Sequence, residues 1–187
     1  MSSESEIMKQ PTTPDELLAM HNLCRSDPYR YLSIVNRWIE NDPTNIDTYF
    51  SRHFGWLEVG DLPRALSDLD YVISHEGEPN VMSYFSRGLL HRQMQQYEKS
   101  VQDFDTAETI DPKGWGEDVV FGLYFQADAH ARLGNEAAAL ACCARLPDDF
   151  WTPGIHGAPR GGKAEVAEEL RRMAAKARRK RGTPSAK

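Results

Sequence analysis

Residues 157–163 form a short motif that could bind a phosphate. The sequence Gly-Ala-Pro-Arg-Gly-Gly-Lys fits the pattern G-x-x-x-x-G-K, in which backbone amides surround the phosphates and the lysine contacts them. However, Ala164 stands where the magnesium-binding Ser or Thr should be, and Pro159 removes one amide from the loop. No predicted strand precedes the motif. We therefore interpret it as part of a connector, and we expect no nucleotide or other cofactor.

Pairs of histidines and of aspartates are further candidates for metal binding or catalysis. His91 and His130 lie 39 residues apart, whereas metal-binding pairs on a helix lie at i and i+4 with a further ligand nearby. We interpret these two imidazoles as packing side chains. The pairs Asp68/Asp70 and Asp148/Asp149 have no neighbouring nucleophile, and we interpret them as solvated surface. The sequence therefore predicts no metal site.

Cysteine usage gives no support for catalysis either. Cys142 and Cys143 lie in a predicted apolar helix, where cysteine behaves as a small hydrophobic residue. With Cys24 they make three, an odd number without the spacing of a disulfide framework. No Ser/His/Asp or Cys/His arrangement can be placed by spacing. We therefore expect no catalytic residues and no enzymatic activity.

Composition places the chain among globular proteins of the cytoplasm. It has 187 residues, of which 40% are hydrophobic and 27% charged. The N-terminus is polar and lacks the apolar core of a signal peptide, and no stretch approaches 18 consecutive apolar residues. These features predict a soluble cytoplasmic protein without a membrane partner.

Charge is divided unevenly along the chain. The net charge is −6, but the segment 161–187 carries nine Lys/Arg and three Glu. The acidic remainder argues against nucleic-acid binding, because phosphate contact needs a basic face. The basic end has three interpretations: a solvated helix face, a contact with an acidic partner or nucleic acid, or a segment that folds back on the acidic body.

The sequence repeats itself. The tetrapeptide Tyr-Phe-Ser-Arg occurs at 49–52 and again at 84–87, an offset of 35 residues. A third copy begins at Leu123, offset by 39, with the surplus residues near Pro112. Each copy has two helix-length stretches separated by a turn, and Ala65, Ser100 and Ala139 put a small residue where the two helices approach.

These copies resemble the tetratricopeptide repeat (TPR), a helix–turn–helix unit of 34 residues. An earlier, degenerate copy has Tyr31, Val35 and Trp38 at second-helix spacing. The resemblance implies an all-α, right-handed superhelix of three to four units with a helix that caps the last one. The expected parts are a flexible N-terminus (1–11), a TPR domain (12–150, with units at 12–45, 46–80, 81–119 and 120–150), a Pro/Gly connector (151–162), a basic amphipathic capping helix (163–181) and a flexible tail (182–187).

The first helices of TPR units line a concave groove that binds a peptide or partner helix, and the resemblance implies such a groove here. Some TPR proteins bind the C-terminal carboxylate of a partner through Lys, Arg and Asn side chains in the groove. The sequence argues against such a carboxylate clamp, since the corresponding positions hold residues such as Phe50 and Phe121. An alternative is that the inner side chains pack against each other or under the N-terminal segment. The candidate groove residues are Asp47, Phe50, Phe54, Leu57, Met82, Phe85, Leu89, Arg92, Phe121, Tyr124, Asp128 and Arg132.

Three functions are compatible with these features. The first is a scaffold or adaptor that binds another protein in the groove. The second is a partner-masking chaperone or an immunity protein that blocks a toxin. The third is a nucleic-acid-associated factor that uses the basic helix, and weak homo-oligomers remain open for any of them.

Overall fold

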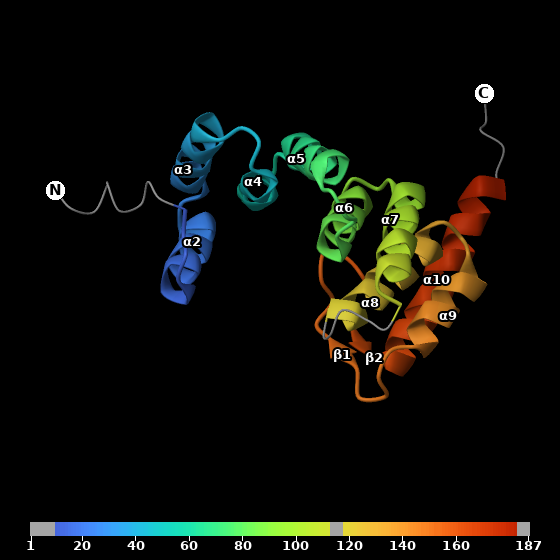
Figure 1. Cartoon of the computed structure of the whole chain (residues 1–187). Helices are drawn as coiled ribbons and strands as arrows, with labels where there is room; N and C mark the ends of the chain where they lie inside the picture. Colours follow the sequence, from blue (N-terminus) through green and yellow to red (C-terminus); the bar gives the residue numbers. More distant parts are fainter. Residues whose placement is uncertain (1–9, 113–117, 183–187) are drawn as a thin grey trace, which may run out of the picture. The chain divides into compact units, whose positions relative to one another are not determined.

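The computed structural model describes residues 10–112 and 118–182, and its fold is all-α, as predicted (Figure 1). Residues 183–187 of the tail predicted at 182–187, and most of the N-terminal segment 1–11, lie outside the described residues. The chain divides into two compact units, Met1–Ser83 and Tyr84–Lys187, which we describe separately as unit 1 and unit 2. None of the described helices is both long and apolar enough to cross a membrane.

Unit 1 contains successive helices joined by short turns. They are α2 (Pro14–Ser26), α3 (Pro28–Asn41), α4 (Ile46–Glu58), α5 (Leu62–His75) and the first residues of α6 (Val81–Gln93). Polar side chains cap the N-termini of three of these helices. Thr13 and Glu16 form a capping box on α2, and Asp27 and Asp61 accept hydrogen bonds from backbone N–H groups in the first turns of α3 and α5.

Apolar faces at helical spacing form the core of unit 1. Tyr31, Val35 and Trp38 of α3 are buried together with Cys24 of α2, so these two helices pack as a pair. Ala65 is completely buried, in agreement with the prediction that a small residue lies where two helices approach.

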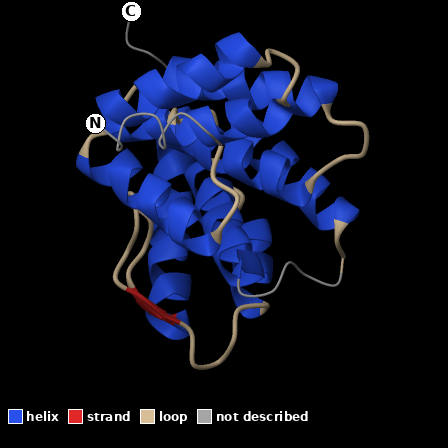
Figure 2. Ribbon diagram, turned by 60° about the vertical axis from the view of Figure 1, so that its left-hand side comes forward, coloured by secondary structure: helices blue, strands red, loops and turns tan. Residues whose placement is uncertain are grey.

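Unit 2 continues the same pattern and then departs from it. After α6 come α7 (Tyr97–Ile110), α8 (Asp118–Arg132) and α9 (Glu136–Ala144). A pair of two-residue strands follows, β1 (Trp151–Thr152) and β2 (Gly161–Gly162), drawn red in Figure 2. The predicted connector is therefore a β-hairpin with a loop at 153–160, which we call the hairpin loop.

The last helix, α10 (Lys163–Gly182), packs on α8 and α9 within unit 2 (Figure 1). Val166, Leu170 and Ala174 are fully buried in this contact, as the predicted amphipathic face requires. Arg178 also donates to the Gly134 carbonyl, and Arg181 lies 3.4 Å from Glu98. These contacts correspond to the interpretation in which the basic end folds back on the acidic body.

The turn inside each repeat has the same backbone conformation. Gly60 (φ 76°), Gln95 (φ 60°) and Gly134 (φ 81°) occupy equivalent positions, and all three lie in the left-handed region. Glycine adopts this conformation without steric cost, but glutamine does not. The second copy therefore carries a strained residue at its turn.

In two successive repeats, an ion pair joins the first helix of the repeat to the second. Arg52 contacts Asp68 at 2.6 Å, and Arg87 contacts Asp103 at 2.7 Å. In the third copy the equivalent residues are Gln126 and Cys142, which lie 3.4 Å apart. The interpretation of Asp68 as solvated surface is therefore wrong: the residue is 3% exposed because Arg52 pairs with it.

Candidate functional site

Within unit 1, helices α2 and α4 line a cleft of about 540 Å³. Leu17 and Phe54 are 55% and 46% exposed, and both line this cleft. Tyr31 and Trp38 of α3 form its floor, with buried Thr48 beside them. Two large apolar side chains thus face an open hollow along α2 and α4.

Polar and charged groups surround the apolar part of this cleft. Glu58 and Asp47 of α4 and Arg25 of α2 line it, so both signs of charge are present. Burial and the nearby Glu58 raise the pKa of Cys24 to about 11, and the thiol stays neutral at physiological pH. The cleft therefore offers apolar and ionic contacts, and its cysteine is not an activated nucleophile.

Of the other groove candidates in unit 1, Met82 is exposed and lies on the first turn of α6. Phe50 and Leu57 are half-buried on α4, where the Phe50 ring lies edge-on to Phe54. Within this unit, Asp47 and Phe54 are the two predicted groove residues that line the cleft.

Phe85 does not belong to an open groove. It is 7% exposed, and its ring lies 5.9 Å from that of Phe104 in the core of unit 2. The prediction that Phe85 contacts a partner is therefore wrong, because its side chain points toward α7. Leu89 on the same helix is partly buried against this core, whereas Phe121 on α8 is 40% exposed.

The inner face of unit 2 is covered by the hairpin loop. The Tyr124 hydroxyl donates to the Pro159 carbonyl at 2.6 Å, and Arg132 Nη2 donates to the Gly157 carbonyl at 2.7 Å. Both terminal nitrogens of Arg92 lie 3.3 Å from the His156 carbonyl. Tyr124 and Arg92 are consequently buried, and the predicted groove is filled here by the chain itself.

Asp128 holds the two arginines in position. Its Oδ2 accepts from Arg92 Nε at 2.6 Å and from Arg132 Nε at 2.8 Å, and the residue is completely buried. Each guanidinium also lies over an aromatic ring, Arg92 over Phe125 and Arg132 over Tyr97. Two of the predicted groove residues are thus cations that converge on one carboxylate.

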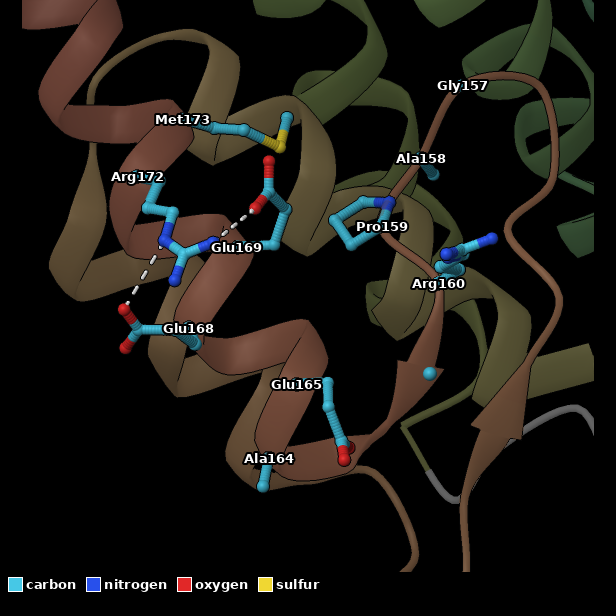
Figure 3. A pocket seen from close by; sticks show the side chains of 11 residues that line it. Gly157, Ala158, Pro159, Arg160, Ala164, Glu165, Glu168, Glu169, Arg172 and Met173 are labelled. Atoms are coloured by element: carbon cyan, nitrogen blue, oxygen red, sulfur yellow. Dashed lines mark ion pairs between the residues drawn. The ribbon is translucent and has the colours of Figure 1, made fainter.

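A second hollow, of about 760 Å³, lies between the hairpin loop and α10 (Figure 3). Figure 3 shows Arg172 between Glu168 and Glu169, with ion-pair distances of 3.5 and 3.6 Å. Glu165 lines it as well, so its carboxylates oppose phosphate binding. Lys163 of the phosphate-loop pattern binds the Leu146 carbonyl and Asp148 instead, and the motif serves as a structural connector.

His91 is buried and His130 is half-buried. His91 Nδ1 lies 2.8 Å from Gln96 Oε1, and burial lowers the pKa of both His91 and His130. In the described part of the chain, no group of three His, Cys, Asp or Glu side chains is placed to hold a metal ion. The imidazoles are thus neutral packing groups at physiological pH.

The chain is similar to known proteins in its structure. No family model and no curated protein matches the sequence. Among solved structures, MamA superposes with a TM-score of 0.63 at 12% identity, covering 91% of this chain and 94% of MamA. A putative kinesin light chain from Podospora anserina, described as having nearly identical TPR-like repeats, gives 0.61 at 12% identity, with coverage of 93% and 100%.

YrrB, described as a TPR protein with an unusual peptide-binding site, superposes with a TM-score of 0.58 at 16% identity, covering 86% of this chain and 77% of YrrB. At such identities the similarity concerns the fold. Together with the 35-residue repeat and its paired helices, it shows that this chain has the fold of tetratricopeptide-repeat proteins.

Proposed function

We propose that this protein is a non-catalytic interaction module that binds an amphipathic helix of a partner protein in the cleft of unit 1. The observation that carries this proposal is the exposure of Leu17 and Phe54 in one cleft. Each apolar Å² left in water costs about 25 cal/mol relative to burial, and a partner's apolar face would recover this free energy.

The shape and charge of the cleft support a helical partner. It lies along α2 and α4, and a third helix with apolar residues at i, i+3 and i+4 can place its anchors between them. Arg25 and Glu58 at the cleft provide ionic contacts of both signs for the polar side of such a helix. The TPR fold supports the same conclusion, since YrrB is described as having a peptide-binding site.

The proposal is tested with a peptide selected from a random phage-display library on the wild-type protein. Leu17→Glu places a charge in the cleft, and we expect it to weaken binding of the selected peptide at least tenfold. Leu18→Glu is the matched control, because Leu18 is also exposed (58%) but does not line the cleft. Fluorescence anisotropy with the labelled peptide measures both.

Phe54→Glu makes the same test on α4, the other helix that lines the cleft. Tyr29→Glu is its control, because Tyr29 is exposed but lies outside the cleft. Loss of binding in both cleft variants and in neither control supports the proposal. Equal binding by wild type and both cleft variants, with unchanged circular dichroism, would place the interaction elsewhere and refute it.

A further inference from the structure

Three side chains of unit 2 bind the hairpin loop through its main chain. Arg92, Tyr124 and Arg132 donate to the carbonyls of residues 156, 157 and 159. The donors come from the inner positions of α6 and α8, where the TPR resemblance places a groove. Because a carbonyl is common to all residues, these contacts do not depend on the sequence of the segment that supplies them.

The hairpin loop has both exposed and buried side chains. His156 and Arg160 are exposed, whereas Ile155 and Ala158 pack against the core and Pro159 is buried. The strand pair joins the two ends of the loop, with Trp151 opposite Gly162 and Thr152 opposite Gly161. The loop can therefore leave the inner face while its ends stay joined.

The carboxylate that holds the two arginines has one oxygen without a hydrogen-bond partner in the described part of the chain. Among the described residues, Asp128 Oδ1 is buried and accepts no hydrogen bond, although Oδ2 accepts two. The Ala158 amide, which lies within the loop, donates to the Ile155 carbonyl instead. A buried acceptor without a donor is unfavourable, and a peptide with a free N–H at this point would satisfy it.

The backbone of the loop is also strained. His156 has a φ of 49°, in the left-handed region that residues other than glycine seldom adopt. Such a conformation persists because the surrounding contacts hold it. Strain in the bound loop lowers the free-energy difference that a competing segment must overcome.

We propose that Arg92, Tyr124, Asp128 and Arg132 form a second peptide-binding site, specific for main-chain groups, which the hairpin loop occupies as an internal ligand. The partner it fits is an extended segment with unpaired carbonyls, a free N–H for Asp128 and small or apolar side chains. This site lies within unit 2 and does not depend on the cleft proposed in unit 1.

The probe is a labelled synthetic peptide with the sequence of residues 152–161. Gly154→Val should release the loop, since a Cβ there would lie 3.0 Å from Arg160 Cβ and 3.1 Å from the Ala158 carbonyl oxygen, at a φ of 80°. We expect this variant to bind the peptide at least tenfold more tightly than the wild type. Gly77→Val is the matched control, because a Cβ at Gly77 meets no atom within 4 Å.

Adding Tyr124→Phe to the released variant removes one donor without changing shape, and we expect it to weaken peptide binding about fivefold, the effect of one hydrogen bond. If Gly154→Val lowers the melting temperature but binds the peptide no better than wild type, the loop is only a structural element and the proposal is refuted.

A measurement on the unmodified protein covers the case in which the variant fails to fold. Trypsin cleaves after Arg160, which is exposed at the end of the loop. An excess of unlabelled peptide, made with Arg160→Gln so that it is not itself cleaved, should displace the loop and speed cleavage at Arg160 several-fold. A scrambled peptide is the control, and an unchanged cleavage rate at saturating peptide would refute the proposal.

Discussion

Arg52 Nη2 lies 2.6 Å from Asp68 Oδ1, and Arg52 Nε lies 2.9 Å from Asp68 Oδ2, so the pair joins α4 to α5 through two parallel hydrogen bonds. Arg87 and Asp103 repeat this arrangement 35 residues later, between α6 and α7. Both aspartates are buried. The Tyr-Phe-Ser-Arg that occurs twice in the sequence therefore ends in an arginine that joins the two helices of its own repeat.

Arg52→Met should destabilise unit 1 strongly. Removing one partner leaves the Asp68 carboxylate buried without its counter-charge, which costs about 3–5 kcal/mol. The double variant Arg52→Met/Asp68→Leu should recover much of this loss, because no unpaired charge remains. Urea unfolding measures both. A double variant that is no more stable than Arg52→Met would show that the helices depend on these side chains for something other than charge pairing.

Phe85→Ala should lower the free energy of unfolding by about 3–5 kcal/mol, the usual cost of removing a buried aromatic ring. Phe54→Ala should change it by less than about 1 kcal/mol, because Phe54 is 46% exposed. Denaturant titration of the two variants checks this ordering. Comparable losses at both positions would mean that Phe54 is covered in solution.

This contrast shows where the sequence was informative. The 35-residue offset predicted the helix pairs, the turns and the small residues Ala65 and Ser100, since a repeated spacing directly reflects a repeated packing. It did not separate Phe54 from Phe85, because a buried and an exposed aromatic at the same helical spacing look alike. The partner of Arg52 was missed for another reason: Asp68 lies 16 residues away on a different helix.

The covering of the inner face in unit 2 could not be predicted from residue types. The hairpin loop binds Arg92, Tyr124 and Arg132 through backbone carbonyls, which are the same in every sequence. The Pro and Gly residues at 153–162 indicated a connector, but they did not indicate where it would lie. The sequence placed these three residues on the first helices of their repeats, α6 and α8, and could not identify what they bind.

Gln95→Gly should stabilise unit 2 by about 0.5–1 kcal/mol. Gln95 has a φ of 60°, which is unfavourable for a side chain, whereas Gly60 and Gly134 hold the equivalent turns. Asn135→Gly is the control, since Asn135 holds the equivalent position in the third copy with a φ of −85° and its side chain makes no capping hydrogen bond. Thermal unfolding compares the two. A Gln95→Gly variant that melts below the wild type would show that the glutamine side chain makes a contact worth more than the strain.

Stability should fall as the pH decreases from about 6.5 to about 4. Burial lowers the pKa of His53 from 6.5 to about 4, although its hydrogen bond with the Phe50 carbonyl opposes this shift. In that range the unfolded chain takes up a proton that the folded chain does not, so the free energy of unfolding decreases by up to about 1.4 kcal/mol per pH unit for this group. The variant His53→Asn keeps a hydrogen-bond donor at this position, but its side chain does not titrate.

Urea titrations at pH 7, 6, 5 and 4 test this directly. His53→Asn should show a shallower loss of stability with falling pH than the wild type, even if it is less stable at pH 7. His91 and His130 retain part of the dependence, since burial lowers the pKa of each. Parallel pH profiles for the two proteins would show that His53 is protonated without cost and that its burial is not maintained in solution.

The contribution of α10 should come from its apolar face rather than from its positive charge. Leu170→Ala removes a fully buried side chain between α10 and the rest of the unit 2 core, and we expect a loss of about 2–5 kcal/mol. Arg178→Ala removes a half-exposed pair with Glu136, for which a loss of about 1 kcal/mol or less is expected. If added salt and Arg178→Ala destabilise the protein as much as Leu170→Ala does, charge attraction to the acidic body, and not apolar burial, would be what holds α10 in place.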